Sequence, residues 1–426
     1  MSTALAAGKA AMKYVVVGGG LAGLSAAVML AQAGKHVVLL EGAPQAGGRC
    51  RSYFDPVLGS VIDNGNHFVL SGNQAVMAYL DTIGGRAGLI GPNKSRTSFV
   101  DIDSGARWTI APDEGPIPFW LFDAKRRVPG TRPADYLPLA RLLFAGPDKR
   151  IGDVLTCRGP LWERLLHPFF IGALNTEPET ASAALAGALV RETFARGGSA
   201  YRIRVAHPSL AAAFVDPAVK FLAARGADIR IGQRVRALGF EDERIASLQL
   251  PGETIPVAAA DTVILAVPPW AAKELLPDIV APEDFRAIVN AHFKIAAPAG
   301  LPPMLGVIGG AVQWIFPFED RISITVSGAD AIVDDDREAL AKRFWADVSK
   351  VLHLPAELPP WQIVKERRAT FAATPEQQRL RPGPVTRRAN LLLAGDWTDT
   401  GLPATIEGAV RSGHAAARLA LARSSV

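Results

Sequence analysis

The stretch that decides the fold lies near the N-terminus and reads Tyr14-Val15-Val16-Val17-Gly18-Gly19-Gly20-Leu21-Ala22-Gly23. A β-rich run leads into three glycines, and apolar residues then recur at helical spacing as far as Ala31. Gly34 marks the end of this helix, and a second buried strand over 36–40 ends at Glu41, which can accept hydrogen bonds from a ribose. The order strand, glycine turn, helix, strand, acid predicts a βαβ unit that binds a dinucleotide.

Each glycine of this turn has a separate expected task. Gly18 permits the tight turn, Gly20 lets the backbone approach a pyrophosphate, and Gly23 lets the helix pack closely on the strand. The helix begins at Leu21 and Ala22, where free N–H groups and the positive end of the helix dipole favour phosphate. A glycine-rich turn without a ligand is the alternative, but it does not account for the complete pattern around it.

A second glycine pair follows in Gly47-Gly48-Arg49. Two adjacent glycines allow another close backbone approach, and Arg49 can pair with a pyrophosphate. Alone this motif is typical of an ordinary surface turn, but after a dinucleotide fingerprint it favours FAD over NAD. The arrangement resembles the amine oxidase and phytoene desaturase superfamily of FAD enzymes.

Polar residues surround a glycine in Asp63-Asn64-Gly65-Asn66-His67. In the superfamily the matching segment runs beside the flavin. The resemblance therefore implies that Asn64, Gly65 and Asn66 contribute to cofactor binding. His67 is expected to contact flavin or substrate, although each of these residues is also a common turn former.

The C-terminal region carries a third motif. A strand over 390–394 ends in Gly395-Asp396, and the Asp396 carboxylate suits a ribityl or phosphate-side hydroxyl. A helix is expected to start near Ala404-Thr405-Ile406 and to aim its positive end at the flavin N1–C2=O edge, where negative charge accumulates on reduction. Glu407 either lies over the flavin or forms a structural ion pair, and both interpretations stay open.

The motifs divide the chain into interleaved segments. The predicted fold class is α/β, a Rossmann-type FAD-binding domain with an inserted α+β substrate domain. We expect a flexible leader over 1–12, an FAD-binding domain over 13–70, 210–280 and 388–426, and a substrate-binding domain over 71–209 and 281–387. A strand is predicted over 228–238, and its Val235 matches the superfamily position at which a backbone valine contacts adenine.

Apolar and basic residues interleave in the first insertion, at 119–122 and Lys125-Arg126-Arg127. This pattern suits an edge that rests on lipid, or equally a pair of core helices with solvated charges. In the second insertion, residues 288–295 alternate like a strand that places Asn290 and His292 on one face. Residues 313–316 and 321–326 are predicted to form a hairpin.

Composition narrows the remaining classes. The formal charge of +5, from 46 basic and 41 acidic residues, does not favour nucleic acid but is compatible with an anionic membrane surface. Cys50 and Cys157 form no metal-binding or disulfide spacing, so we expect no metal and a reducing cytoplasm. No apolar run is long enough to span a membrane, so we expect a soluble or peripheral protein.

Three segments, 62–73, 160–183 and 391–413, give the most specific resemblance. They are similar to the squalene-associated FAD-dependent desaturase group. The resemblance implies reductive dehydroxylation of hydroxysqualene to squalene in bacterial squalene and hopanoid synthesis, with hydride from reduced flavin N5 quenching an allylic cation. It also implies a long apolar isoprenoid substrate and transient contact with the preceding enzymes of the pathway.

Loss of the allylic hydroxyl calls for a proton donor, and the candidates are His67, His292, Asp63 and Glu407. We favour His67, because it follows a glycine turn and its residue type titrates near neutrality. A hydrogen bond that only fixes that turn is the alternative. Three other functions stay open: an oxidative carotenoid-type desaturase, a flavin amine oxidase in which Lys294 holds a water, and a non-catalytic flavin scaffold.

Overall fold

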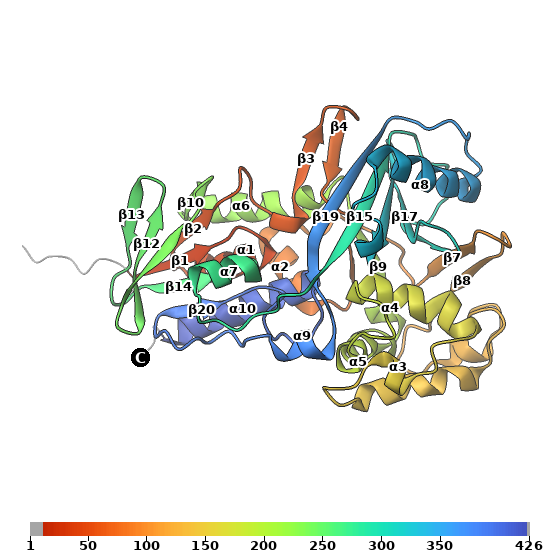
Figure 1. Ribbon diagram of the computed structural model, residues 1–426, viewed down its shortest axis with the longest axis horizontal. Coiled ribbons are helices and arrows are strands. Elements are labelled where there is room, and N and C mark those ends of the chain that lie inside the picture. The colour runs from red at the N-terminus through yellow and green to blue at the C-terminus, as the bar shows by residue number, and fades with distance from the viewer. Residues whose placement is uncertain (1–11, 424–426) are drawn as a thin grey trace, which may run out of the picture.

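The computed structural model describes residues 12–423 and shows two sheets at opposite ends of an elongated molecule (Figure 1). The expected leader, apart from Met12, lies outside the described residues. No helix of the described chain is long and apolar enough to cross a membrane.

The strands and helices have the following bounds. The strands are β1 (Lys13–Val17), β2 (His36–Glu41), β3 (Ser52–Asp55), β4 (Ser60–Asp63), β5 (Phe68–Leu70), β6 (Leu89–Ile90), β7 (Thr97–Asp101), β8 (Arg107–Ile110), β9 (Ile203–Ala206), β10 (Asp228–Ile231), β11 (Ala237–Glu241), β12 (Arg244–Leu250), β13 (Glu253–Pro256), β14 (Thr262–Leu265), β15 (Phe285–Phe293), β16 (Leu305–Ile308), β17 (Trp314–Pro317), β18 (Ile322–Ser327), β19 (Trp361–Phe371) and β20 (Leu391–Leu393). The α-helices are α1 (Leu21–Gln32), α2 (Gln74–Ile83), α3 (Ile151–Val154), α4 (His167–Leu174), α5 (Ala183–Glu192), α6 (Asp216–Ala223), α7 (Pro269–Leu275), α8 (Arg337–Leu352), α9 (Pro375–Arg379) and α10 (Ile406–Arg423). The 3-10 helices are η1 (Gly48–Cys50), η2 (Arg86–Gly88), η3 (Phe119–Phe122), η4 (Pro133–Phe144), η6 (Phe194–Arg196), η7 (Gly198–Ala200) and η9 (Ala329–Ala331), and the π-helices are η5 (Trp162–Leu166) and η8 (Ala211–Val215).

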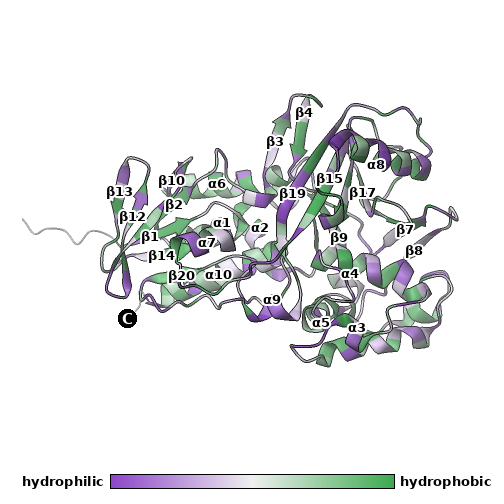
Figure 2. Ribbon diagram, viewed as in Figure 1, coloured by the Kyte–Doolittle hydropathy of each residue, from purple (hydrophilic) through white to green (hydrophobic). Residues whose placement is uncertain are grey.

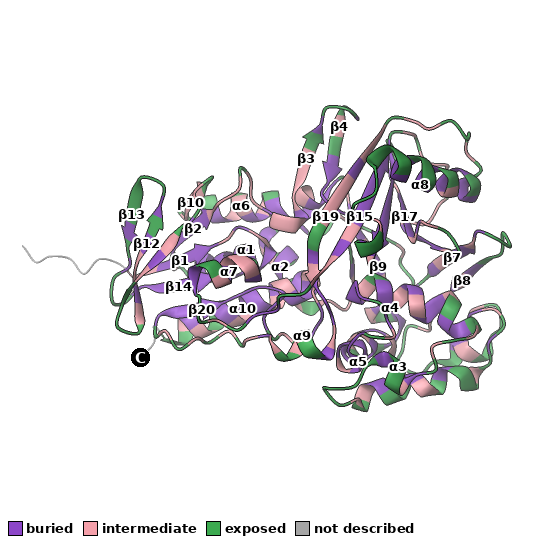
Figure 3. Ribbon diagram, viewed as in Figure 1, coloured by how far each residue is buried: buried purple, intermediate pink, exposed green. Residues whose placement is uncertain are grey.

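A five-stranded sheet, here called the parallel sheet, has the order β10-β2-β1-β14-β20 with every pairing parallel. Four of its strands, β2, β1, β14 and β20, are largely buried (Figure 3), as expected for a parallel sheet, whereas the edge strand β10 is half-exposed. Tyr14 and Val16 of β1 face the cluster formed with α1 and α10, whereas Val15 and Val17 face the opposite cluster. This alternation explains why the strands read as continuous apolar runs.

The single strand predicted over 228–238 is wrong. β10 ends at Ile231 because Gly232 adopts a left-handed conformation with φ of +75° and turns the chain out of the parallel sheet. The next strand, β11, belongs to a separate antiparallel sheet with β12 and β13.

A seven-stranded sheet, here called the large sheet, has the order β19-β15-β18-β17-β16-β7-β8. A parallel pairing of β7 with β16 joins the two insertions in this one sheet, while the division of the chain into domains stays a prediction. The predicted hairpin is present as β17 and β18. β15 is a largely hydrophobic inner strand, and its edge neighbour β19 is largely hydrophilic (Figure 2).

Candidate active site

The turn after β1 requires glycine at two of its positions. Gly18 has a φ of +109°, and a Cβ there would lie 2.5 Å from the backbone oxygen of Ala266. A Cβ on Gly23 would lie 1.8 Å from the backbone oxygen of Gly18. Both are backbone clashes that no rotamer can relieve, so the geometry accounts for these two glycines without any ligand.

Gly20 is different, because a Cβ there would meet no protein atom within 4 Å. Packing therefore does not explain this glycine, whereas close approach of a pyrophosphate does. The first N–H groups of α1, at Leu21 and Ala22, have no intrahelical acceptor and are oriented to bind an anion. The residues present thus fit the diphosphate of FAD.

The second glycine pair lies directly against this turn. The Gly47 amide donates to the Gly19 carbonyl over 2.8 Å, and Gly20 and Gly47 form an isolated parallel bridge. A Cβ on Gly48, whose φ is +55°, would lie 3.2 Å from the Gly20 Cα. The two sequence motifs therefore meet in space, as their common assignment to the cofactor predicts.

Glu41 holds the turn from the end of β2. One carboxylate oxygen accepts from the Gly19 amide over 2.6 Å, and the other accepts from the Ala43 amide over 2.7 Å. Each oxygen keeps a further lone pair, so a ribose bond remains compatible with both contacts. Gln233 donates its backbone amide to the Glu41 carbonyl over 2.8 Å, which brings the segment carrying buried Val235 to the same edge.

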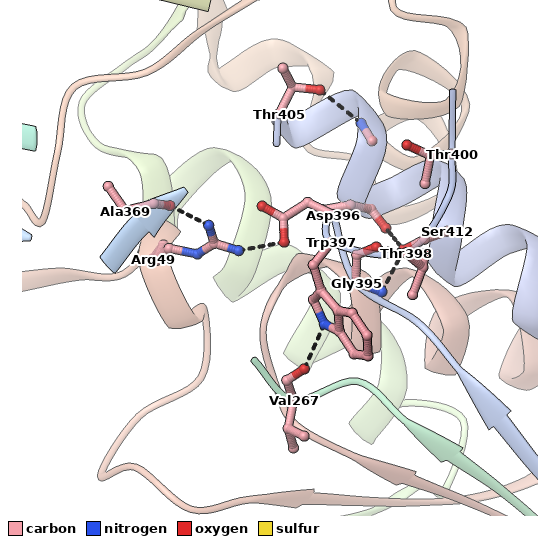
Figure 4. Close-up of polar contacts among 12 residues, drawn as sticks. Arg49, Val267, Ala369, Gly395, Asp396, Trp397, Thr398, Thr400, Thr405 and Ser412 are labelled. Atoms are coloured by element: carbon pink, nitrogen blue, oxygen red, sulfur yellow. Dashed lines mark hydrogen bonds and ion pairs between the residues drawn. The ribbon is translucent and has the colours of Figure 1, made fainter. Parts of the chain in front are cut away.

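Asp396 follows β20 and pairs with the arginine of the second glycine motif (Figure 4). The Arg49 Nη2 lies 2.6 Å from Asp396 Oδ1, and Arg49 also donates to the Ala369 carbonyl. The sequence predicts separate cofactor contacts for these two side chains. The structure shows instead that they bind each other and so join the two ends of the chain.

Arg381 is a residue that the sequence reasoning missed. Its buried guanidinium donates to the carbonyls of Asp396, Trp397 and Thr398, and to the Thr400 hydroxyl. The indole of Trp397 donates to the Val267 carbonyl over 2.9 Å, and the Gly395 amide donates to Ser412 over 2.8 Å (Figure 4). Side chains thus hold the loop after β20 in place. The only sequence signal for this was Arg381 itself, which stands in no recognisable motif.

α10 begins at Ile406, close to the position predicted. The Thr405 hydroxyl accepts from the Gly408 amide over 3.0 Å and acts as the cap of the helix. Ala404, Thr405 and Ile406 are all half-buried at this helix start. They remain the predicted contacts for the flavin ring.

Glu407, one of the predicted catalytic residues, has structural partners. Its carboxylate is buried and accepts from the amides of Ala75 and Val76, at the start of α2, over 3.2 and 3.0 Å. It also pairs with Arg411 over 3.0 Å. Glu407 therefore caps α2 and forms the structural ion pair that was one of its two interpretations.

His292, another predicted catalytic residue, is held by contacts within the protein. Its ring is fully buried in β15, with Nδ1 2.7 Å from the Ser323 hydroxyl and Nε2 3.1 Å from the Asp63 carbonyl. Burial, with the nearby Arg321 charge, lowers its pKa to about 3. With both nitrogens engaged, His292 positions the 63–67 segment on the large sheet and cannot reach a substrate.

The 64–66 segment also contacts the large sheet. Asn64 Nδ2 donates to Glu366 over 3.2 Å, and a Cβ on Gly65 would lie 3.2 Å from Asn290 Nδ2. Asn66 Nδ2 donates to Thr325 Oγ1 over 3.2 Å, while its buried Oδ1 has no partner in the described chain. The structure gives these side chains protein partners, and the predicted flavin contacts stay a prediction.

Asp63 and His67 both line a narrow, tightly packed cavity that has no room for a water molecule in this structure. Its remaining lining is Asn66 with five apolar residues, Val205, Ala206, Leu210, Phe316 and Phe318. Asp63 Oδ1 accepts from the Ser52 hydroxyl over 2.5 Å and from the Leu210 amide over 2.9 Å, while Oδ2 has no partner among residues 12–423. Burial raises the pKa of this carboxyl group.

His67 forms no hydrogen bond with any residue that the structure describes. Burial and the charge of Arg49 lower its pKa to about 4. The expectation that it titrates near neutrality is therefore wrong, and the imidazole is neutral at pH 7. The alternative that it fixes the turn by a hydrogen bond has no support in these contacts.

The comparisons with known proteins agree with this geometry. Residues 21–421 match the family described as flavin containing amine oxidoreductase. The chain belongs to this family. The family assignment confirms FAD as the cofactor and the protein as an FAD-dependent oxidoreductase.

Similar proteins narrow the resemblance within the family. A hydroxysqualene dehydroxylase of Rhodopseudomonas palustris is 53% identical over 408 residues, covering 96% of this chain and 98% of the relative. Another from Sinorhizobium fredii is 51% identical over 410 residues, with the same coverage. The crystal structure of cyclohexylamine oxidase from Brevibacterium oxydans superimposes with a TM-score of 0.72 at 14% identity, covering 98% of this chain and 100% of that one. The predicted resemblance and fold class are confirmed.

Proposed function

We propose that the protein catalyses reductive dehydroxylation of hydroxysqualene to squalene in bacterial squalene and hopanoid synthesis. The observation that carries the proposal is the end-to-end match with hydroxysqualene dehydroxylases at about half of all positions. In the reaction one C–O bond breaks, one C–H bond forms, and the hydroxyl group leaves with a proton as water. Bound in its reduced form, FAD supplies the hydride.

The protein must help the hydroxyl group to leave and keep water from recapturing the cation. The narrow cavity beside Asp63 and His67 has the lining that both tasks need, because its other walls are largely apolar, and its side chains must move apart to admit the hydroxyl-bearing end of the substrate. Phe316 and Phe318 come from the large sheet and its following turn, and Leu210 comes from the other side. Such walls exclude water and strengthen the electrostatic effect of the few polar groups present.

We assign the two polar side chains different tasks. Neutral His67 can orient the hydroxyl group by a hydrogen bond, but its lowered pKa leaves no imidazolium to act as an acid at pH 7. Asp63 has a raised pKa and an Oδ2 atom without a described partner, so this oxygen can carry the proton that is transferred. General acid assistance of this kind contributes about 10² to 10⁴-fold in rate.

The substitutions that test this assignment are Asp63→Asn and His67→Ala, each assayed for turnover and for bound FAD. We expect Asp63→Asn to lower the rate by about 10² to 10⁴-fold with FAD retained. His67→Ala should mainly raise KM, because it removes an orienting contact. Loss of FAD from either variant would assign that residue to the cofactor site, and full activity would exclude it from catalysis.

The overall function is tested by anaerobic incubation of the dithionite-reduced protein with hydroxysqualene and, separately, with phytoene. We expect squalene to form as the flavin reoxidises, and no change in phytoene. Desaturated product from phytoene with the oxidised protein would favour the carotenoid-type desaturase instead. A flavin that bleaches reversibly without any turnover would favour the scaffold.

The amine oxidase alternative loses its main residue. Lys294 follows β15 and donates its ammonium group to the Leu58 carbonyl, in the turn between β3 and β4. It is therefore engaged at the outer hairpin rather than holding a water at the Asp63–His67 cavity.

The proposed substrate is a long apolar isoprenoid, which partitions into lipid. We therefore extend the proposal to peripheral contact with a membrane and transient contact with the preceding pathway enzymes. Co-purification on membrane fractions at low salt, and its loss at high salt, would test the first of these contacts.

A further inference from the structure

The 3-10 helix η4 presents three ridges, because residues three apart eclipse each other in this geometry. One ridge, Tyr136, Leu139 and Leu142, is buried against the protein. The two outer ridges also carry large apolar residues, with Leu137 72% and Phe144 85% exposed. The helix therefore exposes large apolar side chains on its solvent side, beside the charged Asp135 and Arg141.

The neighbouring segment adds to the same surface. In and before η3, Ile117, Phe119 and Phe122 are 60%, 65% and 75% exposed. The rings of Trp120 and Tyr136 meet edge to face at 5.7 Å and bring η3 against η4. We call the set Ile117, Phe119, Phe122, Leu137 and Phe144 the docking face. It lies in the gold segment at the lower right of Figure 1, at the opposite end from the parallel sheet.

The exposure of the docking face does not come from loose packing. α5 approaches η4 so closely that a Cβ on Gly187 would lie 2.1 Å from the Leu142 carbonyl oxygen. The Tyr136 hydroxyl accepts from the Val128 amide over 3.0 Å, which ties the connecting loop to the helix. A firmly seated element with this much exposed apolar area marks an interaction site.

The segments of the docking face carry exposed acids, Asp123 and Asp135, and two basic side chains without partners among the described residues. The Lys125 and Arg141 side chains are exposed and form no ion pair or hydrogen bond within residues 12–423. By contrast, Arg126 pairs with Asp113 over 2.7 Å, and Arg127 donates to backbone carbonyls. Of the three basic residues expected at a lipid surface, only Lys125 is available for it, and the buried Trp120 is not an anchor.

We propose that the docking face inserts its apolar side chains into an anionic lipid bilayer, with Lys125 and Arg141 placed against lipid phosphates. Exposed Phe and Leu side chains beside unpaired cations are the composition that binds a membrane interface. The inference rests on the proposed function, because contact with a bilayer would serve the enzyme only if its substrate is an apolar molecule held there, as hydroxysqualene is. The proposed partner of this face is the lipid surface. Binding to a second protein is the alternative that the test must exclude.

The test is cosedimentation of the flavin-loaded protein with vesicles of equal parts phosphatidylcholine and phosphatidylglycerol at low salt. The docking-face variant carries Phe119→Ser, Phe122→Ser, Leu137→Ser and Phe144→Ser. We expect its partition coefficient to fall by at least about 100-fold. Each substituted side chain loses most of the free energy gained when an apolar side chain moves from water into lipid. Its thermal midpoint and flavin content should match the wild type, because these side chains are exposed.

A matched control is available on the hairpin of β3 and β4. Phe54, Val57 and Val61 are 63%, 62% and 46% exposed there, away from the docking face. The variant Phe54→Ser, Val57→Ser, Val61→Ser should bind vesicles as the wild type does. An equal loss in this control, or none in the docking-face variant, would overturn the proposal.

The charge contribution is measured with Lys125→Gln combined with Arg141→Gln. Binding to the anionic vesicles should fall by about 25-fold at low salt, at about 5-fold per cation, with no change on pure phosphatidylcholine. Sedimentation velocity without vesicles tests the alternative that the docking face binds a second copy of the protein. A wild-type dimer that the docking-face variant converts to monomer, with vesicle binding unchanged, would assign this face to a second copy and refute the lipid proposal.

Turnover of hydroxysqualene in detergent micelles separates this inference from the proposed function. We expect the docking-face variant to keep wild-type turnover in micelles and to lose it on vesicles by at least about 10-fold. Absence of turnover in micelles with the wild-type protein would refute the function, while the vesicle partition coefficients would still decide the lipid contact.

Discussion

The turns after β1 and after β20 lie at the same edge of the parallel sheet, but different contacts hold them. Around the first turn, backbone groups meet directly, as in the Gly47 amide bond to the Gly19 carbonyl. Around the second turn, the buried Arg381 collects three carbonyls and Arg49 pairs with Asp396. Backbone packing makes the first turn intolerant of side chains, whereas the second depends on partners from distant parts of the chain.

The largest expected effect compares two glycines within the first turn. Gly23→Val places atoms against the Gly18 carbonyl, so we expect a loss of about 4 kcal/mol or more in unfolding free energy. At Gly20 an added Cβ meets no protein atom within 4 Å, so Gly20→Val should change the stability of the apoprotein by only about 0.5 kcal/mol. Urea unfolding and FAD titration of both variants test this.

Gly20→Val should nevertheless lose most of its FAD, because its side chain occupies the approach of the pyrophosphate. Full FAD retention by Gly20→Val would show that the turn serves structure alone. Equal destabilisation by both substitutions would remove the distinction between the two glycines.

The second turn should lose much of its stability when a single side chain, Arg381, is removed. Arg381→Met leaves three buried carbonyl acceptors without their donor, so we expect a loss of about 3 kcal/mol in unfolding free energy. Arg379→Met is the matched control, since Arg379 forms only an exposed ion pair with Asp148 and should cost less than about 1 kcal/mol. Similar urea midpoints for the two variants would contradict the proposed role of Arg381.

Among residues 12–423, Glu41 is the side chain that binds the backbone of the first turn. Glu41→Ala removes the acceptors of the Gly19 and Ala43 amides, and we expect a loss of about 2 kcal/mol together with at least about 10-fold weaker FAD binding. Glu41→Gln keeps one acceptor oxygen and should fall between the two proteins. Isothermal titration of the apoproteins with FAD measures the order, and wild-type affinity in Glu41→Ala would exclude a ribose contact.

Contacts made by side chains can also depend on pH, whereas backbone contacts do not. His292 and His414 have pKa values lowered to about 3 and about 4, first by burial and then by the arginine charges beside them. Below pH 6.5 these histidines bind protons in the unfolded chain but not in the folded protein. The stabilisation from the two neutral histidines is therefore present above pH 6.5 and is lost as the pH falls toward 4. We expect up to about 1.4 kcal/mol per pH unit for each histidine.

Urea midpoints at pH 7, 6 and 5 measure this slope. In His292→Gln the slope should be shallower, while Gln can still bond to Ser323 or to the Asp63 carbonyl. An unchanged slope would mean that His292 titrates alike in the folded and unfolded chain.

These contrasts explain what could be predicted from the sequence. The fingerprint around Gly18, Gly20 and Gly23 is recognisable because its causes are local: a turn, a strand and a helix start within a few residues. Arg381 could not be found in this way, since its acceptors lie on a loop that follows a separate strand. The cap that Glu407 forms could not be found for the same reason, because the amides that it caps belong to α2.

The sequence likewise could not predict which residues of the docking face are exposed. A mixture of apolar and basic letters over 119–127 predicts either a core or a lipid contact, and the structure shows a buried Trp120 between exposed Phe119 and Phe122. Which letters face outward depends on the 3-10 geometry of η4, whose period of three differs from that of an α-helix. No pattern in the sequence announces a 3-10 helix of this length.

The order of synthesis gives the closing of the parallel sheet a further consequence. β20 and α10 are synthesised long after β1 and α1, yet β20 completes one edge of the sheet and α10 lies against α1, where Ser25 donates to the Val410 carbonyl. A nascent chain therefore carries the glycine turn long before it has the second half of its cofactor site. A chain that stops before β20 leaves β14 as an exposed apolar sheet edge, which chaperones and proteases can bind.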